Sequence, residues 1–335
     1  MSRALPAALG AALTARLEGV PRQELRSRAR RLSEAYRARQ PTAGTIRDET
    51  DVLAYALTRL PATYAASIAV LDRLRLEQPD MAPLSLLDTG SGTGAASWAA
   101  GVVWPQITQM TMLDRSRSFL DFAAALAAGS GNPALTDADF MTADLASLPQ
   151  SPSVVDLVVA AYALTELAEA DLAAVAGSLW AKVSAAGALV LIEPGTPRDH
   201  ARLMRVRDRL ITLGARIVAP CPHQADCPMT GGDWCHFSVR LPRSRDHMLL
   251  KDGVVPFEDE KFSYLVARRI GASAGGRMIA PLRVAKPGVT ARICGPTGIN
   301  ETFMLRRDKP AFDSLRKKDW GDAVVASRAI PEEIV

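Results

Sequence analysis

A glycine-rich stretch, LLDTGSGTGAASWAA at residues 86–100, limits most tightly how this chain can fold. An apolar run ends in Asp88, three glycines follow at alternate positions, and an alanine-rich helical segment begins directly after them. Glycine allows a sharp turn and lets the backbone approach a ligand without an intervening Cβ. The first N–H groups of the helix then point at that ligand. The stretch therefore predicts a strand, a ligand-binding loop and a helix in an α/β domain.

The rest of the central chain shows the same pattern, in which short apolar runs alternate with helical stretches. Strands are expected at 84–90, 107–114, 134–140, 154–162 and 187–195, and helices at 94–103, 116–128, 166–183 and 198–213. Two further strand-like runs follow at 215–222 and 234–242. This alternation predicts a parallel sheet that is covered by helices on both faces.

The two ends of the chain have different patterns. Residues 1–78 are helical in pattern, and two amphipathic helices are expected there with a break at Leu60-Pro61. Beyond residue 245 a helix is expected near 259–270, followed by strands joined by Gly-Pro and Thr-Gly turns.

The acidic residues around the glycine loop indicate which ligand it binds. A dinucleotide loop is written G-x-G-x-x-G, whereas this loop is D-x-G-x-G-x-G and looks like motif I of class I S-adenosylmethionine-dependent methyltransferases. Asp114 ends the next strand, at a spacing suited to accepting hydrogen bonds from both ribose hydroxyls. Asp144 stands where this fold usually contacts the adenine amino group. The expected cofactor site consists of Asp88, Gly90, Gly92, Gly94, Asp114, Asp144 and Tyr162.

The predicted fold class is therefore α/β, with a class I methyltransferase (Rossmann-like) sheet. We expect a helical, basic N-terminal region at 1–78, the methyltransferase-like domain at 79–245 with a cysteine loop at 220–236, and a small β-rich region at 246–335 that completes a metal site. The alternative is a domain that keeps this shape without its ligand.

Catalytic residues cannot be assigned from the sequence. The stretch after the fourth strand is AAYALTEL, which lacks the polar-Pro-Pro anchor that holds an exocyclic amine in many base methyltransferases. A base could instead be positioned by Tyr162, with Glu166 or Glu193. Pro220-Cys221 resembles the Pro-Cys pair of cytosine C5 enzymes, but Cys221 stands among other cysteines, which disfavours a nucleophilic role.

All four cysteines of the chain fit one metal centre. Cys221, Cys227 and Cys235 share a loop rich in Pro, Gly and Asp, and Cys294 ends a strand before a GPTG turn. Four thiolates suit an all-cysteine zinc site or a 4Fe-4S cluster, and the residues alone do not separate the two. His223 and His236 allow a zinc site of three cysteines and one histidine. Disulfides and uninvolved thiols are the remaining alternatives.

Charge indicates a polyanionic partner. Residues 21–40 carry seven arginines against two glutamates, within a chain of net charge +4, and further basic stretches occur at 198–210, 240–245, 267–269 and 314–320. Scattered basic patches suit RNA better than one small ligand, although a solvated helix face is the plainer interpretation of a single stripe. No apolar run is long enough for a membrane helix, and sparse cysteines indicate a reducing compartment, so a cytoplasmic monomer is expected.

Seven motifs together resemble the methyltransferase-like family of small ribosomal subunit assembly proteins, over residues 45–322: RLPATYAASIAVLDRL, LLDTGSGTGAASWAA, LVLIEPGTP, APCPHQADCPM, WCHFSVRLPR, EDEKFSYLVARR and KKDWGD. The resemblance implies a factor that binds ribosomal RNA, with S-adenosylmethionine at Asp88, Gly90, Gly92, Gly94 and Asp114. It also implies a 4Fe-4S cluster on Cys221, Cys227, Cys235 and Cys294. The chain would act in a bacterial cytoplasm, or in the mitochondrial matrix if it is eukaryotic. An active rRNA methyltransferase and a small-molecule methyltransferase are the competing functions.

Overall fold

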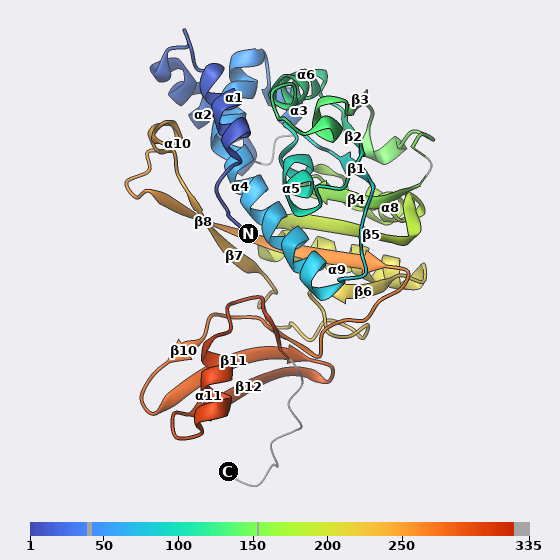
Figure 1. The fold of residues 1–335 in the computed structure, drawn as a ribbon, viewed down its shortest axis with the longest axis vertical. Helices are drawn as coiled ribbons and strands as arrows, with labels where there is room; N and C mark the ends of the chain where they lie inside the picture. The colour runs from blue at the N-terminus through green and yellow to red at the C-terminus, as the bar shows by residue number, and fades with distance from the viewer. Residues whose placement is uncertain (39–41, 153, 325–335) are drawn as a thin grey trace.

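The computed structural model describes residues 1–38, 42–152 and 154–324. A large sheet forms its centre (Figure 1), with eight strands among the described residues in the order β3-β2-β1-β4-β5-β8-β6 and β7 paired to β8. Its strands are β1 (Ser85–Thr89), β2 (Gln109–Asp114), β3 (Asp139–Thr142), β4 (Val155–Ala161), β5 (Val183–Pro194), β6 (Arg216–Ala219), β7 (Phe237–Pro242) and β8 (Phe257–Arg268). Strands β1 to β5 are parallel to one another, and β8 runs antiparallel to β5, β6 and β7.

Helices cover both faces of this sheet, as the alternating pattern predicted. One face carries α4 (Glu49–Glu77), α5 (Ala95–Val103) and α6 (Arg117–Ala127), and the other carries α8 (Leu172–Ala181) and α9 (Pro197–Thr212). Alternate residues of β4 enter the two cores: Leu157 and Val159 pack on the first side, Val158 and Ala160 on the second. This explains why β4 is apolar from Leu157 to Ala161, because a strand buried on both faces has no polar side. Within the described part of the chain, no helix is long and apolar enough to cross a membrane.

The short elements around the sheet complete this domain. They are α7 (Pro133–Thr136), η1 (Leu145–Ser147), η2 (Leu164–Glu166) and η3 (Glu169–Asp171). The strand expected at 134–140 is wrong in its first half, which forms α7. The reason is local: the Asn132 side chain accepts a hydrogen bond from Ala134 N, and Pro133 occupies the first turn, two signals that start a helix.

The N-terminal region packs on the sheet as α1 (Ala7–Ala15), α2 (Arg22–Arg37), α3 (Thr42–Thr45) and the long α4. The break expected at Leu60-Pro61 is wrong, because α4 continues through Pro61. Proline lacks one N–H, so it removes one helical hydrogen bond. Buried Leu57, Leu60 and Tyr64 hold the helix against its neighbours on both sides of Pro61, and this packing outweighs the lost bond.

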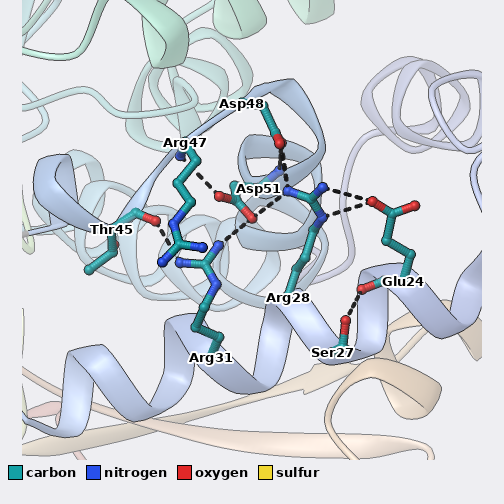
Figure 2. Close-up of polar contacts among 8 residues, drawn as sticks. All are labelled: Glu24, Ser27, Arg28, Arg31, Thr45, Arg47, Asp48 and Asp51. Carbon is teal, nitrogen blue, oxygen red and sulfur yellow. Dashed lines mark hydrogen bonds and ion pairs between the residues drawn. The ribbon is translucent and has the colours of Figure 1, made fainter.

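The arginine stripe of α2 faces carboxylates of the protein itself. Figure 2 shows its centre, where Asp51 is completely buried and accepts hydrogen bonds from Arg28 and Arg31. Arg28 also contacts Glu24 and Asp48. The remaining described pairs of the stripe are Arg22 with Asp246, Arg26 with Asp252, and Arg30 with Asp252. Five of the seven arginines thus form internal ion pairs, which leaves little of this stripe for phosphates; Arg39 lies outside the described residues.

The chain beyond residue 245 divides between two sheets. The helix expected near 259–270 is wrong: these residues belong to β8, which lies between β5 and β6 in the main sheet and pairs with β7 through a hairpin carrying α10 (Arg245–Leu250). The main sheet therefore extends past 245. A second sheet lies at the opposite end of the molecule from the N-terminal helices (Figure 1). It consists of β9 (Gly276–Met278), β10 (Arg283–Val284), β11 (Gly288–Gly295), β12 (Gly298–Leu305) and β13 (Ala323–Val324), covered by α11 (Lys309–Arg316).

Candidate functional site

A crevice opens at the carboxyl ends of the parallel strands, where the strand order reverses between β1 and β4. In open α/β sheets this switch point is where ligands bind. The cavity measures about 890 Å³ with its open mouth included. The predicted residues that line it are Gly90, Gly92, Asp114, Asp144 and Tyr162.

The glycine loop has the backbone that its sequence requires. Gly90, Gly92 and Gly94 have φ values of +67°, +53° and +83°, in the left-handed region that only glycine enters without strain. A Cβ on Gly90 would lie 2.6 Å from the Cβ of Ala163 on the loop after β4. The glycines therefore let two loops close around the crevice and leave the N–H groups of the first turn of α5 near it.

Asp114 joins the glycine loop to the end of β2. One carboxylate oxygen accepts a hydrogen bond from Gly92 N at 2.8 Å, and the other accepts one from Ser116 N at 2.8 Å. Burial raises the pKa of this carboxyl, and the two backbone N–H groups oppose that shift. Since each carboxylate oxygen has two lone pairs, both can still accept a bond from a ligand hydroxyl. This is the arrangement that a ribose diol needs.

Asp88 and Asp144 lie differently from each other. Asp88 is buried behind the loop, where it accepts hydrogen bonds from Ser97 N at 3.1 Å and Ser97 Oγ at 2.7 Å, and burial raises its pKa to about 6. Its second oxygen has no hydrogen-bond partner among the described residues. Asp144 is exposed in the crevice and accepts a bond from Ala146 N at 2.8 Å. Asp88 thus holds α5 in place, while Asp144 faces the ligand space.

The three side chains considered for positioning a base are engaged by the protein. Tyr162, at φ +59°, donates its hydroxyl hydrogen to Glu260 Oε1 at 2.8 Å. Glu166 pairs with Arg115 at 2.9 Å across the crevice. Glu193 is buried and accepts a hydrogen bond from Leu164 N at 2.9 Å, and burial raises its pKa to about 8.

The four cysteines line one apolar cavity between the two sheets. It measures about 500 Å³ with its open space included, and Cys221, Cys227, Cys235 and Cys294 all border it. Burial, followed by the charges of neighbouring cysteines, raises the pKa of Cys294 to about 12 and that of Cys235 well above its usual value. His223 Nε2 lies 3.7 Å from Cys294 Sγ. Within the described residues, no three Cys, His, Asp or Glu side chains stand close enough together to hold a metal ion as they are placed.

Two buried arginines beside this cavity have roles that the sequence does not indicate: Arg207 lies in the basic stretch at 198–210, and Arg277 lies in none of the basic stretches. Arg277 donates to Pro220 O at 2.9 Å, next to Cys221, and pairs with Glu77 at the end of α4. Arg207, on α9, donates to the carbonyls of His223 and Ala225 in the cysteine loop. Both lower the pKa of Cys221, against a larger effect of burial. The partners of Arg277 are 57 and 200 residues away, so local patterns could not reveal them.

The sheet order and the crevice define a class I methyltransferase-like protein, as its sequence predicted. Residues 49–325 match the family described as "Mitochondrial small ribosomal subunit Rsm22", and the chain belongs to this family. The predicted resemblance is thereby confirmed.

Curated relatives agree with this assignment. The human "Ribosome assembly protein METTL17, mitochondrial" is 32% identical over 81% of this chain and 61% of its own length. The fission yeast (Schizosaccharomyces pombe) "Rsm22-cox11 tandem protein 2, mitochondrial" is 29% identical over 58% of this chain and 29% of its own length. The chain thus spans about three fifths of the human relative and less of the yeast one. Among solved structures, the plantazolicin methyltransferase BpumL with SAH is 11% identical, with a TM-score of 0.44 over 74% of this chain and 98% of that one.

Proposed function

We propose that this chain is an assembly factor of the small ribosomal subunit that binds S-adenosylmethionine and ribosomal RNA. The names of its family and of its human relative support the assembly role. The observation that carries the proposal is a cluster of exposed cations in the C-terminal region. The candidate catalytic side chains of the methyltransferase-like crevice, in contrast, are engaged by the protein itself.

The crevice supports S-adenosylmethionine binding through Asp114. Its two oxygens would accept the ribose hydroxyls, the glycine loop would face the amino-acid moiety, and Asp144 would face the adenine. Calorimetric titration of the purified chain with S-adenosylmethionine and S-adenosylhomocysteine tests this assignment. Micromolar binding is expected, and no heat of binding at millimolar ligand would refute it.

The cysteine cavity supports a 4Fe-4S cluster over zinc. Four cysteine thiols border it, with His223 beside Cys294, and its wall is otherwise mostly apolar. Two buried guanidinium groups can balance the negative charge that four thiolates bring. Cys221, Cys227, Cys235 and Cys294 would hold the cluster, which would tie the cysteine loop to β11. Iron, sulfide and zinc should be measured on anaerobically purified protein. Four irons per chain with a brown chromophore are expected; one zinc in a colourless protein would refute the assignment.

The C-terminal region has exposed cations without carboxylate partners, which could contact RNA, whereas most arginines of α2 form internal ion pairs. Lys286 precedes β11, and Arg306, Arg307 and Lys309 follow β12; the pairing of Gly288 with Leu305 brings all four to one end of this hairpin. All four are exposed, and within the described residues none forms an ion pair. Phe303, 49% exposed on β12, adds an aromatic surface on which a base could stack. Cations without internal partners can neutralise phosphates and release counterions.

Filter binding of small-subunit RNA over a range of salt concentrations tests this surface. The double variant R306Q/R307Q should weaken RNA binding and lower the salt slope by about 2. The matched double variant R22Q/R26Q removes the same charge from α2, where both arginines already have carboxylate partners, and should leave the slope unchanged. The reverse result would move the RNA surface to the N-terminal region.

An active rRNA methyltransferase is the rival function. The engagement of Tyr162 with Glu260 and of Glu193 with Leu164 N supports a non-catalytic role. Transfer of labelled methyl groups to RNA in subunits from a deletion strain would overturn it. We expect a monomer, in the mitochondrial matrix if the chain is eukaryotic, as the names of the relatives suggest, or in a bacterial cytoplasm.

A further inference from the structure

A second cavity lies beside the cofactor crevice, between α2, α4 and α10. It measures about 1160 Å³ with its open space included, and Tyr55 on α4 borders both cavities. The ring of Tyr55 also packs on Phe119, with centroids 4.9 Å apart, so the dividing wall is fixed. Nothing in the proposed function uses this second cavity.

Arg59 on α4 is the unusual residue of this cavity. Its guanidinium lies 5.3 Å from the ring centroid of Tyr36 on α2 and 5.7 Å from that of Tyr162, which borders the cofactor crevice. Among the described residues, none accepts a hydrogen bond from Arg59, and its single ion pair is a long one, 3.8 Å to Glu260 Oε1. That same oxygen already accepts the Tyr162 hydroxyl.

A guanidinium group has five N–H donors, and those of Arg59 donate to no acceptor among the described residues. The Arg59 side chain is 25% exposed and borders the cavity, so its donors are open to water or to a ligand there. Two aromatic rings hold its plane in place. Arg59 is therefore positioned to bind an anionic group that enters the cavity from outside.

The remaining lining indicates what carries that anion. Arg30 and Lys251 also border the cavity but pair with Asp252 and Glu258. Arg37, which has no ion pair among the described residues, adds a second cation to Arg59, against Glu34. Tyr36 is 41% exposed and presents a flat apolar surface next to Arg59. An aromatic ring beside a guanidinium without a hydrogen-bonded acceptor suits a nucleotide, whose base stacks while its phosphate takes the forked donors.

We propose that this cavity binds one unstacked ribonucleotide, with its phosphate on Arg59 and its base against Tyr36. The inference deepens the proposed RNA binding and rests on it for the source of the nucleotide. Its residues are separate from the C-terminal cluster of Lys286, Arg306, Arg307 and Lys309, so the two can fail separately. The nucleotide would lie one side chain, Tyr162, away from the cofactor crevice.

Saturation-transfer NMR and calorimetry on the full chain, with uridine and adenosine 5′-monophosphates as probes, test the proposal. The wild type should bind the nucleotides, Arg59→Met should weaken binding at least tenfold, and Tyr36→Leu should weaken it severalfold. Arg59→Lys keeps the positive charge, and so controls for any part that this charge has in stability, but it removes the forked N–H donors. An intermediate loss of nucleotide affinity is expected. Arg209→Met, an exposed arginine on α9 across the sheet, is the charge-matched control and should bind as the wild type does.

Three results would overturn the assignment: no nucleotide binding by the wild type at millimolar concentration, equal binding by folded Arg59→Met, or inorganic phosphate bound as tightly as the nucleotides. If nucleotide binding fails while R306Q/R307Q still weakens RNA binding, the pocket is refuted and the proposed function stands. If nucleotides bind but R306Q/R307Q has no effect on RNA, the C-terminal surface is refuted instead.

Discussion

Replacing Asp51 by asparagine tests whether the arginines of α2 hold the fold together or are available to a polyanion. Asp51 is completely buried, and its carboxylate accepts hydrogen bonds from Arg28, Arg31 and the backbone N–H of Arg47 (Figure 2). Asparagine keeps the shape and one acceptor oxygen but removes the charge that both guanidinium groups share. Arg31 then keeps only the carbonyl of Thr45, whereas Arg28 still has Asp48 and Glu24.

The expected loss follows from these contacts. Breaking a fully buried ion pair costs about 3–5 kcal/mol because it leaves a buried charge unpaired. Here the two arginines are 23% and 31% exposed, so water can replace part of what Asp51 supplied. We expect the free energy of unfolding to fall by about 2–3 kcal/mol, less than the full buried value and more than the roughly 0–1 kcal/mol of a surface pair.

Urea unfolding at neutral pH measures this loss as a lower midpoint at unchanged slope. Asp121→Asn is the matched control, because its pair with Arg117 is exposed on both sides, and it should cost less than about 0.5 kcal/mol. Burial raises the pKa of Asp51, but the hydrogen bonds from Arg31 and Arg28 outweigh burial and leave this pKa below its usual value in the folded chain. Its contribution is therefore present above the ordinary aspartate pKa and lost as the pH falls through the lower folded value. An unfolding free energy within about 0.5 kcal/mol of wild type would show that the stripe is not structural.

Other substitutions test the crevice and the core. Asp114→Asn should weaken S-adenosylmethionine binding by about 10- to 100-fold in calorimetry, since charge-assisted hydrogen bonds are worth about 1.5–3 kcal/mol each, whereas Asp88→Asn should change it by less than about threefold. Equal losses would contradict the different positions of these two carboxyls. Gly90→Ala should lower stability by about 1–3 kcal/mol, because its Cβ meets Ala163 and its φ is positive, while Gly10→Ala in α1, with open space around it, should be neutral or stabilising by up to about 1 kcal/mol. Burial raises the pKa of Glu193 from 4.5 to about 8, so the folded state holds a proton that the unfolded state loses between these values. Wild-type stability should therefore decline from pH 5 to pH 8, and Glu193→Gln should flatten that decline in thermal melts; parallel curves would contradict a buried neutral carboxyl.

The strands that the sequence predicts best are those buried on both faces. Strands β1, β2, β4 and β5 lie within or close to their expected ranges because a strand covered by helices on both sides is apolar throughout. Strand β8 was predicted as a helix because its first half, EDEKF, is charged, and charge of that kind suits an exposed helix. Its paired residues on β5 and β6 lie 47 to 80 positions earlier, and pairing with them outweighs the local preference.

The roles of charged residues were harder to predict, because partners distant in sequence decide them. The stripe of α2 and the cations after β12 are alike in composition. The first meets Asp51, Asp246 and Asp252 in the folded chain, and the second meets no acidic partner in the part that the structure describes. Arg59 opens the motif RLPATYAASIAVLDRL and Arg277 lies outside the quoted motifs, and neither sequence context indicates what the side chain contacts. The number of basic residues in a segment therefore cannot separate a structural arginine from one that binds a ligand. The contacts that each guanidinium makes in the folded chain can separate them.

The two motif acids show the same limit inside the best-predicted site. Spacing along the chain treats Asp88 and Asp114 alike, since each ends a strand next to the glycine loop. The strand register separates them, because Asp88 lies opposite Met112 on β2, and Asp114 is two residues further along that strand. Asp88 is therefore below the loop, where Ser97 of α5 binds it, and Asp114 reaches the level of Gly92 at the floor of the crevice. The position of each carboxyl along its strand depends on how β1 pairs with β2. This position lets Asp88 stabilise the loop and α5, and lets Asp114 face the ligand.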